Sequence, residues 1–263
     1  MIKLHGSAFR MPILLALAAA PGAALADDYR FEVQGGFDRS EDDSFPNADT
    51  TNLAGTWYFS RVSTNDVPLA EAAFLGRASS LSATLSHFDF LDIHLNSQAA
   101  RVGYYLPGTM FYGSAGVRRM ETVSSLFELP SLEVQTEYDY DTSWFGEFGI
   151  APLDGLLLTT SFQEGSYDPN LTARYVGKLP NSHYYAGSVT IEDREVGDAS
   201  YNLDFDYYFD HTLSVGLGYG NANGFDGWEL RAQKFFSDNW AVSASLRTDD
   251  FSDSYGIRVT WRH

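Results

Sequence analysis

The sequence predicts an all-β protein, a transmembrane antiparallel β-barrel of about 14 strands, and three observations support this prediction. Apolar and polar residues alternate in one segment after another, each long enough to cross a membrane. Between these segments, short connections alternate with longer acidic connections. Aromatic residues gather beside the short connections, as they do at a membrane interface.

The first 26 residues have the pattern of a secretory signal peptide. Lys3 and Arg10 make the segment basic, an apolar stretch follows, and Ala24-Leu25-Ala26 supplies the small residues of a cleavage site. The apolar stretch is too short for a membrane-spanning helix. We therefore expect residues 1–26 to be removed after export and residues 27–263 to form a single outer-membrane barrel.

Charge and composition exclude several classes of protein. Without the signal peptide, the chain keeps all 35 acidic residues but only 15 basic ones, a net charge of about −20. Such a charge argues against nucleic acid as a partner, because phosphates require a basic surface. The absence of cysteine excludes disulfides and thiol chemistry. No apolar run of ~18 residues follows the signal peptide, so a spanning helix is not expected.

Strict alternation identifies the strands. In the last segment, one face carries Tyr255, Ile257, Val259 and Trp261, and the other carries Gly256, Arg258, Thr260 and Arg262. The same pattern predicts strands at about 28–38, 50–60, 79–87, 97–106, 109–120, 137–151, 155–164, 169–179, 183–192, 199–209, 212–219, 227–236, 240–247 and 255–263. The third and fourth are the least marked, so 12 strands remain an alternative.

The connections indicate which end faces which side of the membrane. Short turns rich in Pro, Gly, Asn and Asp occur at 106–108, 152–155, 179–182, 210–211 and 237–239. Longer acidic connections occur at 39–49, 88–96, 121–136, 165–169, 193–198, 220–226 and 248–254. Bacterial barrels have short periplasmic turns and longer external loops, so an even number of strands places both termini in the periplasm.

Aromatic residues beside the short turns predict one interfacial girdle. They are Tyr104, Tyr105, Phe111, Tyr112, Tyr184, Tyr185, Tyr207, Tyr208, Phe209, Phe235, Phe236, Trp240 and Trp261. A soluble β-sandwich, the alternative fold, has no reason to confine its aromatic residues to one kind of turn.

Residues 61–78 form an unusually long connector where a short periplasmic turn is expected. Residues 68–75 predict one or two helical turns that begin at Pro68. The connector could cover the lower mouth of the barrel, fold into the lumen, or serve as a plain linker.

Two segments carry a resemblance to a known family. The opening Asp27-Asp28-Tyr29-Arg30-Phe31-Glu32-Val33 and the segment Pro68-Leu69-Ala70-Glu71-Ala72-Ala73-Phe74-Leu75 resemble a porin family of Gram-negative bacterial outer membranes. The resemblance implies a porin-like barrel and transfers no catalytic residue. Outer-membrane barrels usually end on an aromatic residue, whereas this chain ends Trp261-Arg262-His263, with His263 in a lipid-facing position.

If the apolar face meets lipid, the polar face lines the interior, because an Arg or Lys facing lipid costs ~2–4 kcal/mol at mid-bilayer. The predicted lining residues are the basic Arg30, Arg101, Arg118, Arg174, Lys178, Arg231, Arg247, Arg258 and Arg262 and the acidic Glu32, Glu147, Asp204, Asp206 and Glu229. This excess of basic groups predicts a pore that favours anions. The alternative is a closed barrel filled by ion pairs, but side chains fill the interior only at about eight strands.

No enzymatic site, metal site or cofactor is expected. His87 and His94 flank an acidic connection that contains Asp89 and Asp92. On paper, Ser86 or Ser97 could complete a triad, and the two histidines and two aspartates could also hold a divalent metal. The spacing matches no known catalytic or metal motif, so we expect solvated loop residues here. The acidic connections at 39–49 and 248–254 could bind Ca²⁺ weakly, although neither matches a Ca²⁺-loop motif.

The sequence therefore predicts an outer-membrane porin, a water-filled channel for passive diffusion of small polar solutes. Its expected partners are outer-membrane lipid, the barrel-assembly machinery through the C-terminal strand, and other copies of the chain if it forms a homo-oligomer. A non-conducting structural or adhesion barrel is the alternative, although connections of at most about 16 residues favour transport over display. An outer-membrane hydrolase is a more remote alternative.

Overall fold

The computed structural model describes residues 28–41, 46–91, 93–127, 134–165, 169–192, 199–222, 225–249 and 252–263. The expected signal peptide lies outside the described residues. No helix in the described part of the chain is long and apolar enough to cross a membrane.

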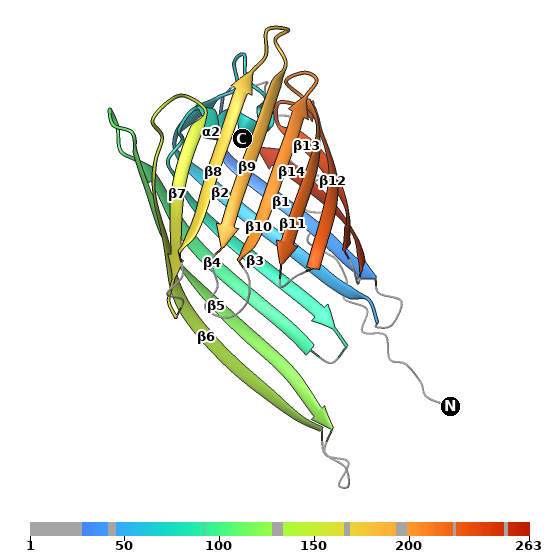
Figure 1. The fold of residues 1–263 in the computed structure, drawn as a ribbon. Helices are drawn as coiled ribbons and strands as arrows, with labels where there is room; N and C mark the ends of the chain where they lie inside the picture. Colours follow the sequence, from blue (N-terminus) through green and yellow to red (C-terminus); the bar gives the residue numbers. More distant parts are fainter. Residues whose placement is uncertain are drawn as a thin grey trace.

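Fourteen antiparallel strands form a closed barrel (Figure 1). They are β1 (Asp28–Glu41), β2 (Ala48–Ser63), β3 (Ser80–Phe90), β4 (Ile93–Tyr105), β5 (Phe111–Phe127), β6 (Val134–Ile150), β7 (Leu156–Gln163), β8 (Asn170–Lys178), β9 (Tyr184–Glu192), β10 (Ser200–Tyr208), β11 (Leu213–Ala222), β12 (Phe225–Ser237), β13 (Trp240–Asp249) and β14 (Asp253–Arg262). Each strand pairs with its neighbours in the sequence, and β1 pairs with β14. The prediction of 14 strands is confirmed, and the alternative of 12 is excluded.

The ends of the chain close the barrel through backbone hydrogen bonds. The carbonyl of His263 accepts hydrogen bonds from the amides of Arg30 and Phe31, both at 2.8 Å, and the His263 amide donates to Phe31 at 2.9 Å. A register shift between Tyr29 and Phe31 marks a β-bulge in β1. Closure removes the free edges of the sheet, as is required of a sheet surrounded by lipid, where unpaired backbone groups have no water to bind.

Alternation assigns the two faces of the wall as the sequence predicts. Directly paired residues face the same side, so Phe205 and Leu217 share the outer face while Asp206 and Gly216 share the inner one. Large apolar side chains are exposed around the outside, for example Leu85 at 51% and Leu246 at 60%. An apolar exterior around a polar interior is the arrangement of a barrel that spans lipid.

Several expected external loops are strands instead. The segment 88–96 continues β3 and β4, which meet at Leu91 with φ 54°. Similarly, 121–136 lies largely in β5 and β6, which are 17 residues each and extend past the other strands at the lower end in Figure 1. In the first of these segments Asp89 alternates with Phe88 and Phe90, so strand pairing satisfies the backbone while the carboxylate stays on the outer face.

The long connector between β2 and β3 folds into the barrel. It contains a 3₁₀ turn, η2 (Leu69–Glu71), followed by a short helix, α2 (Ala72–Leu75). Leu69 packs with Phe235 and Ala241, and Phe74 packs with Val176, so the connector contacts the far wall of the lumen. Of the three arrangements that the sequence left open, folding into the lumen is the one observed.

Candidate functional site: the lumen and its short-turn end

The inner wall carries most of the predicted lining residues. Strand pairing places Glu32, Arg101, Arg118, Glu147, Arg174, Lys178, Asp204, Asp206, Glu229, Arg231, Arg247, Arg258 and Arg262 on its inner face. Arg30 is the exception. Because of the bulge after Tyr29, its guanidinium lies 5.5 Å from the ring of Trp57, which faces outward. The strict alternation assumed from the sequence fails at this position.

Glu71 fixes the connector to the opposite wall. Its carboxylate accepts a hydrogen bond from Arg174 at 2.6 Å and another from the hydroxyl of Tyr208 at 2.6 Å. Only 4% of Glu71 is exposed. Burial raises the pKa of the Glu71 carboxyl, and the positive charge of Arg174 and the Tyr208 hydrogen bond only partly offset this effect. No local feature of the sequence indicates this contact, because both partners are more than 100 residues away.

Arg262 holds the connector from the other side. Its side chain donates to the carbonyl of Leu69 at 2.8 Å and to the carboxylate of Glu32 at 2.6 Å. The guanidinium also lies 4.5 Å from the ring of Tyr29 and 4.7 Å from that of Phe235. A buried cation that has a carboxylate, a carbonyl and two ring faces as partners is well compensated, so this contact fixes the position of η2.

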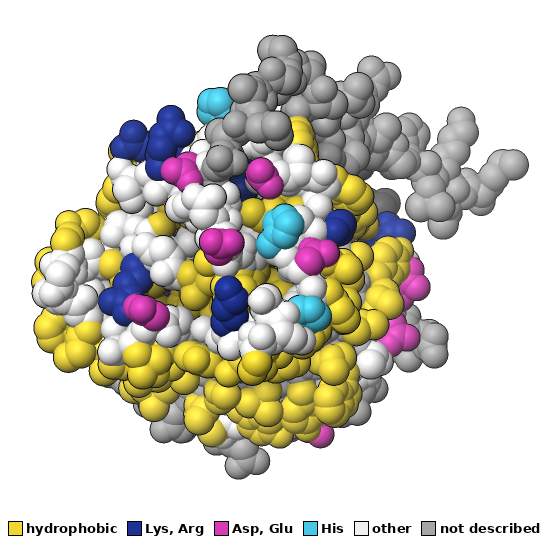
Figure 2. Space-filling model, turned by 90° about the horizontal axis from the view of Figure 1, so that it is seen from above, with side chains coloured by type: hydrophobic (Ala, Val, Ile, Leu, Met, Phe, Trp, Pro, Cys, Tyr) yellow, Lys and Arg dark blue, Asp and Glu magenta, His cyan; other side chains and the backbone are white. Residues whose placement is uncertain are grey.

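The aromatic residues near the short turns fall into two groups. Tyr104, Phe111 and Phe209 are exposed on the outer face, as a girdle requires, and so is Phe236 at 72%. By contrast, Tyr105, Tyr112, Tyr184, Tyr208 and Phe235 face inward. The prediction of a single girdle is therefore wrong for this second group, of which Tyr184, Tyr208 and Phe235 contact the connector. Figure 2 looks onto this end: hydrophobic side chains gather around the outside, and polar and charged ones lie within.

Charged clusters occupy the middle of the inner wall. Arg231 contacts Asp204 at 2.5 Å, Asp206 at 3.3 Å and Glu229 at 3.8 Å. Gly216 makes room for this cluster, because a Cβ at that position would collide with the Asp206 carboxylate. Elsewhere, Arg101 pairs with Glu147, and Arg258 pairs with Asp38 at 3.1 Å. Most of the inward arginines therefore have a carboxylate partner, either on a nearby strand of the wall or, for Arg174, on the connector.

Arg118 and Arg247 differ from these arginines. In the part of the chain that the structure describes, neither forms an ion pair. Arg118 lies 5.6 Å from the ring of Phe145 and lines a cavity of about 320 Å³ beside Arg101 and Glu147. Arg247 also lines a cavity, so both guanidiniums border open space inside the barrel.

The predicted excess of positive charge is absent from the described inner wall. Removing Arg30 leaves eight inward basic residues. Pairing and the connector add Asp38, Glu71, Glu192 and Asp249 to the five predicted acids, which makes nine. Asp139 and Asp141 continue the inner face on the protruding β5–β6 hairpin. The interior is close to neutral and has an acidic outer end.

The connector separates two cavities. On the lumen side, a cavity of about 370 Å³ is lined by Ala70 and Glu71 together with Asp206, Arg231 and Arg258. On the side of the short turns, a cavity of about 570 Å³ is lined by Leu69, Asp66, Lys178 and His211, among others. Residues 69–71 are thus the partition between the inner wall and the short-turn mouth.

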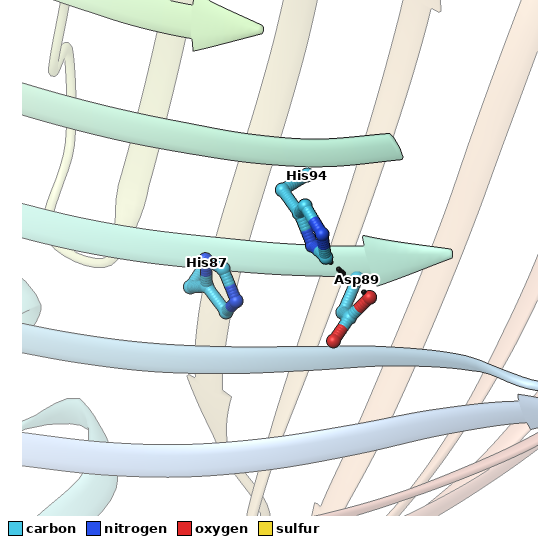
Figure 3. Close-up of side chains that lie close together, drawn as sticks. All are labelled: His87, Asp89 and His94. Atoms are coloured by element: carbon cyan, nitrogen blue, oxygen red, sulfur yellow. Dashed lines mark ion pairs between the residues drawn. The ribbon is translucent and has the colours of Figure 1, made fainter. Parts of the chain in front are cut away.

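The histidines noted in the sequence lie on strands, at the opposite end of the barrel from the connector. His87 and Asp89 on β3 and His94 on β4 share the outer face and come together (Figure 3). Ser86 and Ser97 have the opposite parity and face the lumen, so the triad considered from the sequence does not form. The expectation that these residues lie in a loop is wrong, although the side chains of Asp89 and His94 are exposed.

Comparisons with known proteins agree with this architecture. The chain is similar in fold to the outer membrane protein Omp33 of Acinetobacter baumannii, with 22% identity and a TM-score of 0.71 over 90% of this chain and 99% of that one. It is also similar to the CymD monoaromatic hydrocarbon channel, with 10% identity and a TM-score of 0.55 over 89% of each chain. The fold thus defines the class, a transmembrane β-barrel of the outer-membrane type.

The sequence itself points to a family within this class. Residues 8–126 match the model of a family described as "putative general bacterial porin". This range includes both segments that carry the resemblance noted above, and the resemblance is confirmed there. No curated protein matches the sequence.

Proposed function

We propose that the chain is an outer-membrane channel for passive diffusion of small polar solutes, and that its connector forms the narrowest part. The observation that carries the proposal is the polar, ion-paired inner wall, which lines cavities inside a barrel whose outside is apolar. In a closed barrel the side chains would fill the interior, whereas this wall keeps cavities of about 320–390 Å³ beside its ion pairs.

The charge of the wall supports weak ion selectivity. Paired arginines contribute little net field, because each lies within contact distance of a carboxylate. The nearly neutral interior therefore favours neither cations nor anions strongly, and the anion preference predicted from the sequence loses its basis.

The second candidate is a barrel that does not conduct. The buried contacts of Glu71 and Arg262 favour it, because they hold residues 69–71 across the short-turn mouth. A catalytic role is not supported, since Ser86 and Ser97 lie on the opposite face of the wall from His87 and His94.

Conductance of the refolded chain in planar bilayers tests the proposal. Steady channels of low conductance would support a narrowed pore. A chain that inserts into the bilayer but never conducts, even with the connector shortened, would indicate the non-conducting barrel instead.

We also propose that the chain reaches the outer membrane after removal of residues 1–26 and that β14 is the strand recognised during assembly. The exposed face of β14 carries Tyr255, Ile257 and Trp261, and His263 stacks on Trp261 with ring centroids 5.9 Å apart. His263 thus continues the row of rings in the position where related barrels place an aromatic residue. Replacing His263 by Phe should not reduce the amount of protein in purified outer membranes, whereas deleting β14 should abolish it.

A further inference from the structure

His87, Asp89 and His94 form a compact group of metal-ligand side chains on the outside of the barrel, near the end that lies farthest from the connector (Figure 3). Asp89 is paired directly with His94 across the β3–β4 ladder, and His87 precedes Asp89 by two residues on the same face. Two adjacent strands therefore present two imidazoles and one carboxylate side by side, a placement that needs no loop to hold it.

The distances suit a single ion. One ligand atom from each residue lies within 4.8 Å of the others, and Nδ1 of His94 is 3.2 Å from a carboxylate oxygen of Asp89. The rings of His87 and His94 are nearly parallel, with an interplanar angle of 9°. Bonds of about 2.0–2.2 Å to a tetrahedral ion bring ligand atoms to roughly 3.3–3.5 Å from one another. Small rotations of these partly exposed side chains cover the remaining distance.

A hydrogen-bond chain fixes the tautomer of His87. The amide nitrogen of Asn96 donates to the Glu121 carboxylate at 3.2 Å, so its amide oxygen faces His87 Nδ1 at 2.8 Å. Because an amide oxygen can only accept a hydrogen bond, Nδ1 of His87 must be the donor and carry the proton. In the neutral ring Nε2 is then the nitrogen without a proton and the one that can coordinate a metal, and Asn96 and Glu121 lie where metal-bound histidines typically have their outer partners.

We propose that His87, Asp89 and His94 bind one divalent transition-metal ion of the Zn²⁺ class, with water in the remaining position. Two imidazoles and a carboxylate favour Zn²⁺, Ni²⁺ or Cu²⁺ over Ca²⁺ and Mg²⁺, which prefer oxygen ligands alone. Asp49, the cross-strand neighbour of Asp89, is already paired with Arg39 at 2.7 Å. The Asp49 carboxylate is thereby neutralised and does not convert the group into an oxygen-rich Ca²⁺ site.

Titration of the full refolded chain in detergent with Zn²⁺, and separately with Co²⁺, tests the proposal. We expect one ion per chain in calorimetry and the visible absorption of four-coordinate Co²⁺. His94→Ala and the isosteric Asp89→Asn should each weaken binding at least tenfold. Asn96→Ala should weaken it by about 10–100-fold, because it removes an outer partner, yet leave the Co²⁺ spectrum unchanged.

His211→Ala is the matched control, since this histidine lies on a short turn at the other end of the barrel. Its affinity for Zn²⁺ should equal that of the unaltered chain. Binding that survives both His94→Ala and Asp89→Asn would overturn the proposal. So would displacement of Zn²⁺ by an equal concentration of Ca²⁺, which would place the ion in acidic connections. Circular dichroism verifies that each variant is folded, and if His94→Ala is not, Asp89→Asn decides.

Discussion

The two ends of the lumen are built from the same alternating strands but have opposite character. At the short-turn end, inward positions carry Tyr29, Tyr208 and Phe235, and the connector packs among them until Leu69 is only 1% exposed. Toward the other end, inward positions carry Asp204 and Arg231, and cavities of 320–390 Å³ remain beside such groups. The size and polarity of inward side chains, rather than the number of strands, therefore decide where this barrel is open.

The largest effect is expected from removing the partition at the short-turn end. Within the connector, residues 67–76 are flanked by two residues with positive φ, Asp66 at 58° and Arg77 at 48°, which makes these positions suitable junctions. Replacing residues 67–76 by a short glycine-containing linker joins the two cavities that residues 69–71 separate. Single-channel conductance should rise several-fold. A variant that folds and inserts but conducts like the unaltered chain would show that the constriction lies elsewhere.

The next largest effect concerns pH and Glu71. Burial raises the pKa of this carboxyl when the connector is docked in the lumen. The docked state therefore binds a proton more tightly than the undocked state does. Docking is therefore most favourable below the ordinary Glu pKa of about 4.3 and weakens as the pH rises through the raised value. We expect conductance measured at falling pH to decrease across this range.

Glu71→Gln should abolish that dependence, since the amide stays neutral at every pH and still accepts a hydrogen bond from Tyr208. Asp210→Asn is the matched control on a short turn. Hydrogen bonds from the Thr212 side chain and backbone lower the pKa of Asp210, so this carboxyl stays ionised throughout the range. If Asp210→Asn changed the pH response and Glu71→Gln did not, the connector would not be the responsive part.

A smaller effect distinguishes the two faces at the short-turn end. Phe235 is 3% exposed inside the lumen, and its neighbour Phe236 is 72% exposed on the outside. Phe235→Ala leaves a cavity beside Leu69 and Arg262 and should lower the free energy of unfolding by about 3–5 kcal/mol. Phe236→Ala leaves no cavity, because detergent or lipid fills the space. It should lower the free energy of unfolding by at most about 1.5–3 kcal/mol. Urea unfolding followed by tryptophan fluorescence measures both, and equal losses would contradict an inward Phe235.

The strands were predictable because their signal is local. Leu217 and Tyr219 alternate with Gly216 and Gly218 in the sequence itself, and the same pattern recurs in every strand that was predicted. The docked connector was not predictable, since Glu71 depends on Arg174, which lies 103 residues away. The alternation of apolar and polar residues does not indicate a contact between residues so far apart in the sequence.

Two other features were missed although local signals existed. Tyr104 and Tyr105 are adjacent, so alternation already requires one of them to face inward, and the structure places Tyr105 there. His87 and Asp89 continue the alternation that begins at Leu85, but their polarity suggested a loop. Beyond the lipid-facing band, polar side chains on the outer face are compatible with a strand, because pairing rather than burial holds it there.

The smallest effect separates paired from unpaired arginines within the open part of the lumen. Arg118 forms no ion pair among the described residues, so Arg118→Ala removes a positive charge that solutes experience. The reversal potential in a salt gradient should shift modestly toward cations, most clearly at low ionic strength, where screening is weak. The double variant Asp38→Ala/Arg258→Ala instead removes a neutral pair that is in contact at 3.1 Å, and it should leave selectivity unchanged. An equal shift in both variants would mean that the pairs do not neutralise the wall, and the charge of the lumen would then depend on every arginine in it.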